Sequence, residues 1–239
     1  MSGRGDELDS AGAEEASMND APAEPAGQGA ARPGGEGSAG LREVERLAGE
    51  GRPRQAIDAL RPLLIDRPTD AALRLRLGRL YEDVGETVLA LEQYQAARSS
   101  DPENVDVLCS VGPVLASLGR WDQAERELRR ALKLDPERAD VHEHLGIILF
   151  KRGLYSQSEA ELRRATELDP SSPAAHFYRG EALNQLGKID EALAMLERAT
   201  ILDPSNAKAY YTMGILYDKK NLPHQAEAMY RRSREVAAA

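Results

Sequence analysis

The sequence has little of what builds disulfides, membrane spans or secretory signals. It contains a single cysteine, Cys109, in 239 residues, and one thiol can form neither an intrachain disulfide nor a thiolate metal cage. The longest stretch without charge, residues 107–119, contains a proline and is shorter than the roughly 20 apolar residues of a membrane helix. No apolar segment follows the first methionine that would serve as a secretory signal. We therefore expect a cytoplasmic protein without a transmembrane helix.

Basic residues are also in deficit, because 31 Lys and Arg stand against 40 Asp and Glu, a formal net charge of −9. Proteins that bind nucleic acids or anionic lipid surfaces usually present an excess of positive charge. One ladder of arginines recurs at Arg130, Arg164, Arg198 and Arg232, but glutamates are interleaved with it. Such residues pair along a solvated helix face, so we expect neither nucleic acid nor a membrane as a partner.

Residues 1–40 differ in composition from the rest of the chain. They are rich in Gly, Ala, Pro and Ser, carry an excess of acidic residues, and contain only Met1, Leu8 and Met18 as large apolar side chains. Such a segment buries too little surface to offset the entropy lost on ordering. We predict a disordered acidic tail that acts as a solubilising extension, with an autoinhibitory or partner-binding role as the alternative.

The remainder of the chain contains a repeat of 34 residues. Three ladders recur at this interval, one of prolines and two of glycines, and apolar residues between them follow a helical period, as in Leu73, Leu77 and Leu80. Each unit is therefore predicted to be two helices. The ladders are Pro68, Pro102, Pro136, Pro170 and Pro204; Gly78, Gly112, Gly146, Gly180 and Gly214; and Gly51, Gly85, Gly119, Gly153 and Gly187, which Asn221 continues.

The two glycine ladders have different predicted roles. The Gly119 type lies between the helices of a unit, where a residue with positive φ ends the first helix and lets the chain reverse. The Gly78 type lies inside the first helix, where glycine costs about 1 kcal/mol of helix propensity. We therefore expect it to mark a close approach of the second helix.

These residues resemble the tetratricopeptide repeat family, in which Leu-Gly-x-x-Tyr is followed by Ala-x3-Phe and a later proline. The departures are few: Ser158 replaces one alanine and Arg179 replaces one leucine. A degenerate unit, in which Val44 replaces the helix glycine, precedes the full units. The best match consists of Leu77, Gly78, Tyr81, Ala90, Tyr94, Ala97 and Pro102.

The resemblance implies an all-α, right-handed helix-pair solenoid of about five full repeats and one degenerate N-terminal repeat, preceded by the disordered tail. The solenoid is expected to span residues 41–239. Its units are a degenerate repeat at 41–70 and full repeats at 71–104, 105–138, 139–172, 173–206 and 207–239.

The resemblance also implies a concave groove, lined by the first helix of each unit, that holds a peptide or a helix of a partner protein. The only two phenylalanines of the chain map to this face, and aromatic anchors commonly carry binding energy. The alternative is that they pack between repeats. We expect the C-terminal half to dominate recognition. The predicted groove residues are Arg76, Arg79, Cys109, His144, Ile147, Phe150, Phe177, Tyr178, Asn184, Tyr211 and Ile215; Pro113 and Lys151 map to the same face.

Signatures of catalysis and of metal or cofactor binding are not found. The sequence has no phosphate-binding loop, nucleophile elbow or HExxH motif, and Cys109 has no cation or base near it in sequence. His142 and His144 are two residues apart on a helix and so face different directions, while His142 and His176 alone would make a weak metal site. We expect no enzyme activity, no cofactor and no metal.

The sequence thus predicts a non-catalytic adaptor or scaffold that binds a segment of another protein in its groove. The alternative is a regulatory or assembly-factor subunit that docks through the solenoid ends or the convex face. We expect a monomer, because the last helix carries Arg234 where earlier units place Leu132, Thr166 and Thr200 against their neighbours.

Overall fold

The structure, a computed structural model, describes residues 34–238, which form twelve α-helices and no strand. The predicted disordered tail lies, for residues 1–33, outside the described residues. The first helix begins at Gly34, upstream of the boundary expected at residue 41. The helices are α1 (Gly34–Gly49), α2 (Pro53–Asp66), α3 (Ala71–Asp83), α4 (Thr87–Ser100), α5 (Val105–Ser117), α6 (Trp121–Leu134), α7 (Ala139–Lys151), α8 (Tyr155–Leu168), α9 (Pro173–Gln185), α10 (Ile189–Leu202), α11 (Ala207–Lys219) and α12 (Pro223–Ala237).

The turn inside each helix pair depends on a left-handed residue. Gly119, between α5 and α6, has φ +73°, and the equivalent glycines of the other units have values from 70° to 78°. Asn221 takes this place in the last unit with φ 55°, as one of the few other residues that tolerate the conformation. The predicted role of this glycine ladder is confirmed.

The second glycine ladder lies where the two helices of a unit touch. A Cβ atom on Gly112 would lie 2.6 Å from Leu128 Cγ, and one on Gly78 would lie 2.2 Å from Tyr94 Cε1. Any larger residue would force the second helix outward, so the close approach predicted from the sequence is confirmed.

Four of the five full units begin their first helix with a side-chain cap, and α7 is the exception, because Arg138 at this position makes no such hydrogen bond. The Asp70 side chain accepts hydrogen bonds from the backbone amides of Ala72 and Leu73, at 3.0 and 3.1 Å. Asn104, Ser172 and Asn206 cap α5, α9 and α11 at the same repeat position. These side chains satisfy backbone donors that have no partner within the helix.

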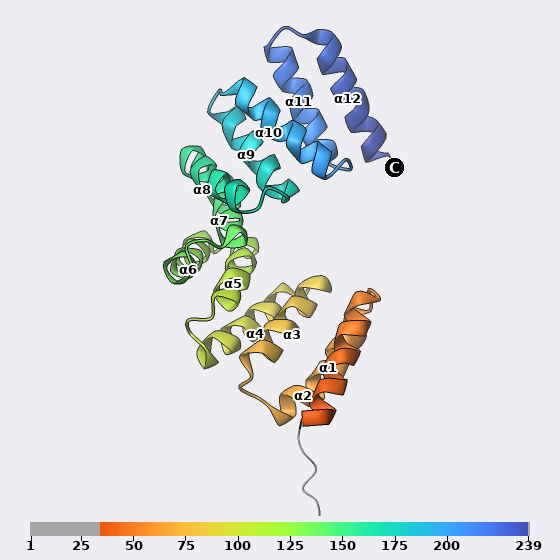
Figure 1. The fold of residues 1–239 in the computed structure, drawn as a ribbon, viewed down its shortest axis with the longest axis vertical. Coiled ribbons are helices and arrows are strands. Elements are labelled where there is room, and N and C mark those ends of the chain that lie inside the picture. Colours follow the sequence, from red (N-terminus) through yellow and green to blue (C-terminus); the bar gives the residue numbers. More distant parts are fainter. Residues whose placement is uncertain (1–33, 239) are drawn as a thin grey trace, which may run out of the picture.

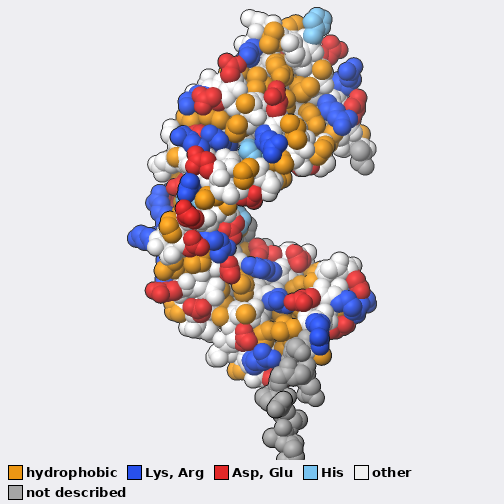
Figure 2. Space-filling view, viewed as in Figure 1, with side chains coloured by type: hydrophobic (Ala, Val, Ile, Leu, Met, Phe, Trp, Pro, Cys, Tyr) orange, Lys and Arg blue, Asp and Glu red, His pale blue; other side chains and the backbone are white. Residues whose placement is uncertain are grey.

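The helix pairs stack into an open arc, with α1 and α12 at its two ends and a hollow on one side (Figures 1 and 2). Successive first helices, α3, α5, α7, α9 and α11, contact one another more closely than successive second helices do. The first helices therefore lie on the inner side of the curve, as the family resemblance implied.

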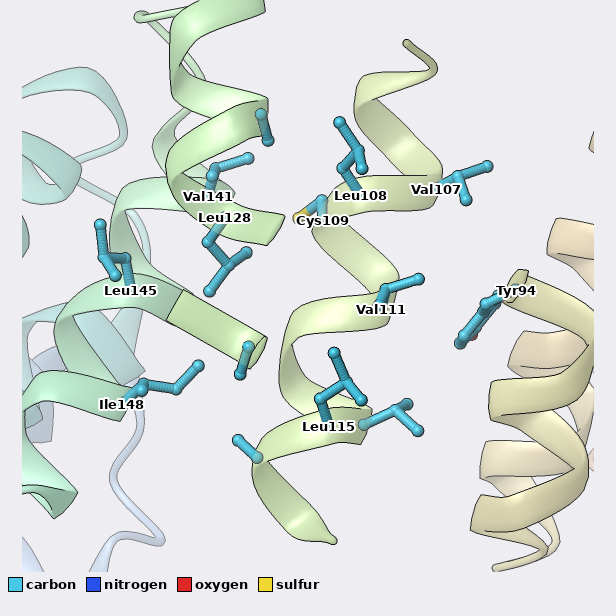
Figure 3. Close-up of a cluster of buried hydrophobic side chains, with 14 of the residues drawn as sticks. Tyr94, Val107, Leu108, Cys109, Val111, Leu115, Leu128, Val141, Leu145 and Ile148 are labelled. Carbon is cyan, nitrogen blue, oxygen red and sulfur yellow. The ribbon is translucent and has the colours of Figure 1, made fainter. Parts of the chain in front are cut away.

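A continuous apolar core runs through the middle of the solenoid. Its buried side chains extend from Ala90 of α4 to Leu149 of α7. Figure 3 shows side chains of α5 between Tyr94 on one side and Leu128, Leu145 and their neighbours on the other. No unit buries its apolar face alone, so neighbouring units share this core.

The two departures from the repeat pattern have local explanations. Ser158, where other units have alanine, is fully buried and donates a hydrogen bond to the carbonyl oxygen of Gly146 at 2.8 Å. Arg179, where another unit has Leu145, lies 3.3 Å from Glu159 Oε1 and donates to Thr166 Oγ1 at 3.1 Å. Each polar exchange is therefore matched by a buried hydrogen-bond partner.

Candidate peptide-binding face

The candidate site is the surface of the first helices that borders the hollow, which we call the inner face (Figure 2). All eleven predicted groove residues lie on α3, α5, α7, α9 and α11. Their exposure differs widely, since Tyr211 is 55% exposed whereas Cys109 is only 5% exposed. The predicted groove residues of the inner face therefore range from exposed to buried.

An aromatic cluster joins α7, α8 and α9. The Phe150 ring lies 5.5 Å from Tyr155 and 5.7 Å from Tyr178, and Phe177 lies 5.1 Å from Tyr178, measured between ring centroids. The Phe150–Tyr178 and Phe177–Tyr178 pairs meet edge to face, an arrangement favoured by the ring quadrupoles. All four side chains are half-buried, so the rings pack between units and also keep part of their surface open.

A second aromatic pair lies near the C-terminal end of the face. The exposed Tyr211 ring is 5.6 Å from Tyr230. Tyr230 donates a hydrogen bond to Asp218 Oδ2 at 2.7 Å, and this bond raises the pKa of Tyr230 to about 12. Asn184 accepts a hydrogen bond from Lys219 at 2.9 Å. Ile215 is half-buried on α11.

Cys109, Asp140 and His144 meet between α5 and α7. Cys109 Sγ lies 3.4 Å from His144 Nδ1 and 3.5 Å from Asp140 Oδ2. Burial, together with the charge of Asp140, raises the pKa of the Cys109 thiol to about 12. Desolvation lowers the pKa of His144. A protonated thiol beside a neutral imidazole is a poor nucleophile, and Cys109 offers little surface to a ligand.

The two predicted arginines at the N-terminal end differ. Arg76 forms an ion pair of 2.5 Å with Glu45 of α1. Arg79 is exposed and makes no ion pair within residues 34–238. Of the two, only Arg79 presents a free cation along this part of the inner face.

A small pocket opens between α5 and α7, with a volume of about 110 Å³. Two predicted residues, His144 and Ile147, line it. The other lining residues are Pro113, Ala116, Ser117, Ile148 and Lys151. Ala116 and Ser117 were missed by the sequence reasoning, although their small size at positions where the next unit has Phe150 and Lys151 was a readable signal.

The histidines on the first helices have structural partners. His142 lies 2.7 Å from Glu161 and 3.0 Å from the carbonyl oxygen of Pro136, and His176 lies 3.0 Å from the carbonyl oxygen of Pro170. Each ring ties its helix to the proline that ends the preceding unit. Among the described side chains, no group of three or more potential ligands is arranged to hold a metal ion.

Sequence models of the tetratricopeptide repeat match residues 41–105, 112–173, 149–207 and 183–238. The chain belongs to the tetratricopeptide repeat family. Proteins of this family generally mediate protein–protein interactions, and the repeat is typically a non-catalytic scaffold. No curated protein sequence matches the chain.

Solved tetratricopeptide repeat structures share this architecture. The pilF protein of Pseudomonas aeruginosa aligns with a TM-score of 0.73 at 22% identity, over 81% of this chain and 88% of that one. YrrB, described as a TPR protein with an unusual peptide-binding site, aligns with a TM-score of 0.60 at 26% identity, over 75% and 93%. MamA from Desulfovibrio magneticus aligns with a TM-score of 0.62 at 20% identity, over 71% and 96%.

Two further features of this tetratricopeptide repeat protein concern membranes and the arginine ladder. Within residues 34–238, no helix is both long and apolar enough to cross a lipid bilayer. The arginine ladder on the second helices is partly paired, since Arg164 lies 3.3 Å from both Glu137 and Glu167. This pairing supports the interpretation of the ladder as a solvated face.

Proposed function

We propose that this chain is a non-catalytic adaptor whose inner face binds a segment of a partner protein. The observation that carries the proposal is the partly open aromatic surface of α7, α9 and α11, where Phe150, Phe177, Tyr178 and Tyr211 lie. Rigid aromatic side chains that keep open surface are typical anchors of an interface. The peptide-binding neighbour YrrB supports the same use of the fold.

The C-terminal half of the inner face supplies most of the expected binding energy. Truncating an aromatic anchor typically costs about 2 kcal/mol or more, which is roughly thirtyfold in affinity. At the N-terminal end, Arg76 is already paired with Glu45, so of the two predicted arginines Arg79 is the one left to attract an acidic partner from a distance.

The test is affinity capture with the full chain from extracts of the source cells, quantified by mass spectrometry. Changing Phe177 and Tyr211 to alanine should abolish capture of a specific partner while helicity is retained. A matched control changes Val88 and Ile201 to alanine, because both are exposed apolar residues on second helices, 60% and 68% exposed. Full capture by the aromatic variant would contradict binding at the inner face.

The alternative function, docking through the convex face or the ends, has its own observation. Ile65, Val88 and Ile201 are the most exposed large apolar side chains of the described chain, and all three lie on second helices. If the Val88 and Ile201 variant lost the partner and the aromatic variant kept it, the convex face would be the docking surface.

We also propose a cytoplasmic monomer. Arg234 and its neighbour Glu235 are exposed on α12, which gives the open end of the solenoid a polar surface. Light scattering at micromolar concentration should return the mass of one chain, 26.1 kDa. A stable dimer mass would overturn this expectation.

A further inference from the structure

The pocket between α5 and α7 exists because one unit carries small residues where the other full units carry larger ones. Ala116 and Ser117 of α5 occupy the repeat positions held by Glu82 and Asp83 in α3 and by Phe150 and Lys151 in α7. Later units have Asn184 with Gln185 and Asp218 with Lys219 at the same places. The missing side-chain volume leaves an indentation of about 110 Å³ on the inner face.

The walls of this pocket are mainly apolar. Pro113 and Ala116 contribute one side from α5, and Ile147 and Ile148 contribute the other from α7. The Ser117 hydroxyl is already satisfied, because it donates to the carbonyl oxygen of Val114 at 2.8 Å. A dry apolar cavity of roughly 150 Å³ holds a benzene molecule, so this smaller pocket suits one aliphatic side chain.

One cation stands free at the edge of the pocket. Lys151 is exposed and makes no hydrogen bond or ion pair with the described part of the chain. The carboxylates on the same helix are engaged, since Asp140 binds Arg138 and Glu143 accepts a hydrogen bond from Ser172. The His144 ring at the pocket is kept uncharged, because desolvation lowers its pKa. A carboxylate on a ligand that occupies the pocket would therefore pair with Lys151.

We propose that this pocket receives a single branched aliphatic side chain of the bound protein segment, and that an acidic side chain next to it pairs with Lys151. The inference rests on the proposed function, because it names the chemistry that the inner face selects. The aliphatic side chain gains apolar contact with Pro113, Ile147 and Ile148, and the charge pair sets the register of the segment along the groove.

The aromatic cluster extends this subsite toward the C-terminal units. Ile147 in the pocket wall and Phe150 in the cluster lie on the same helix, α7. A segment that follows the inner face would place its aliphatic residue at α5 and α7 and its following residues over Tyr178 and Phe177. The pocket then determines sequence preference, whereas the aromatic surface supplies area.

The experiment begins with a library of random twelve-residue peptides displayed on phage and selected against the full chain. The strongest binder is synthesised with an acetylated N-terminus and an amidated C-terminus, so that carboxylates come only from side chains. We expect the selected peptides to share Leu, Ile or Val within two positions of Asp or Glu. Titration with the peptide should shift the Ile147 and Ile148 methyl signals in NMR spectra and leave those of Ile65 and Ile201 unchanged.

Two substitutions then test the pocket directly. Ala116→Phe fills it with the side chain that the next unit carries at the same position. The affinity for the peptide, measured by calorimetry, should fall at least tenfold. Lys151→Glu should weaken it about fivefold. The matched controls are Ala160→Phe, at an exposed position of α8, and Lys133→Glu, at an exposed position of α6, which should leave affinity unchanged. Ser117→Leu blocks the pocket from an exposed position if Ala116→Phe fails to fold.

The outcomes separate this inference from the proposed function. One outcome is that the blocking variants still bind the peptide, that the Ile147 and Ile148 signals do not shift, and that binding is lost when Phe177 and Tyr211 become alanine. This outcome overturns the proposed role of the pocket and supports binding in the groove. Binding lost in the blocking variants but kept by the aromatic variant supports the pocket and contradicts the aromatic anchors. A library that yields no binder overturns both, and selected peptides without an acidic residue overturn the role of Lys151.

Discussion

The α6–α7 junction and the α8–α9 junction each bury a glutamate, but they neutralise its charge with arginines at different positions. Glu125 of α6 and Glu159 of α8 occupy the same repeat position, and both are buried. Each is paired with an arginine four residues later on its own helix, Arg129 and Arg163. A second arginine comes from the next unit.

The position of this second arginine differs. Glu125 is met by Arg152, which caps the C-terminal end of α7, whereas Glu159 is met by Arg179 in the middle of α9. The two units exchange residue types, since the position of Arg179 is Leu145 in the earlier unit and the position of Arg152 is Leu186 in the later one. Leucine and arginine have thus been interchanged between two places that reach the same carboxylate.

This difference decides where the apolar core is continuous. Leu145 is buried in the cluster that extends from α4 to α7. At the α8–α9 junction a polar contact of Arg179 with Glu159 and Thr166 takes its place, and a small separate cluster of Leu162, Ala165 and Ala175 remains. A buried ion pair stabilises little compared with an apolar pair, but removing one partner is costly. The two junctions should therefore respond differently to mutation.

The largest effect should come from Arg179→Leu. Glu159 would stay buried with Arg163 as its only remaining cation, so we expect the free energy of unfolding to fall by about 3 kcal/mol. Urea unfolding followed by circular dichroism measures it. The matched change at the other junction, Arg152→Leu, should cost less, because Arg152 is more exposed, 28% against 19% for the side chains. Equal losses would contradict the distinction between the junctions.

The exchange of positions can be tested by copying it. The double variant Arg179→Leu with Leu186→Arg places leucine and arginine at the α8–α9 junction as they stand at the α6–α7 junction. We expect it to recover stability to within about 1 kcal/mol of the unmodified chain, since the new arginine replaces the lost partner of Glu159. Stability no better than that of Arg179→Leu alone would show that an arginine at position 186 cannot replace the arginine at position 179 as a partner of Glu159.

The ionisation of Glu159 should appear in the pH dependence of stability. Burial opposes its charge, but the hydrogen bond and charge of Arg163, with Arg179, lower the pKa of Glu159 below its ordinary value. The unfolded chain then binds the proton first, so this contribution is present above the unfolded pKa and is lost as pH falls through the folded pKa. In the variant with leucine at both Glu159 and Arg179, the free energy of unfolding should depend less steeply on pH below about 4.3. The slope should be smaller by up to about 1.4 kcal/mol per pH unit.

The smallest expected effect concerns Ser158, in the unit between the two junctions. Ser158→Ala removes the hydrogen bond to the Gly146 carbonyl, which should cost about 0.5 to 1 kcal/mol of unfolding free energy. The reverse change, Ala124→Ser in the preceding unit, places a hydroxyl beside the equivalent carbonyl of Gly112. A thermal unfolding series of both variants checks this, and a loss above about 2 kcal/mol in Ser158→Ala would mean that the serine does more than this bond provides.

The repeat frame was readable because each marker has a local physical cause. A residue with positive φ must be glycine or a near substitute, which is why Gly119 and Asn221 identified the turns. The closeness of the two helices at Gly112 likewise excludes any other side chain. Such requirements act within one unit and recur with its period, so a single sequence displays them several times.

Pairings between units were not readable in the same way. Arg179 was recognisable only as the residue that replaces a leucine of the repeat pattern. Nothing in the sequence identified Glu159 as its partner. Within single units, the aromatic contacts of Tyr155 with Phe150 and of Tyr230 with Tyr211 were also missed, because Tyr155 and Tyr230 lie on second helices that the groove positions do not include. Contacts of both kinds depend on side-chain length and direction where two helices pack together.

The inner-face prediction falls between these cases. Phe177 and Tyr211 could be placed on first helices from their repeat positions alone. How much of each remained open could not be foreseen, since it depends on neighbours such as Tyr178 and Tyr230 in the folded chain. The same holds for Cys109, which the helix position directs to the inner face but which His144 and Asp140 of the next unit cover.

The sequence by itself determined the family, the helix-pair units, their turns and the face that each first helix presents, because periodic local constraints specify these features. Only the tertiary structure decided the pocket beside Ala116, the interchange of Arg152 and Arg179, and the exposure of each inner-face residue. These depend on how one unit is packed against the next, where the shapes and charges of nonequivalent side chains must fit together.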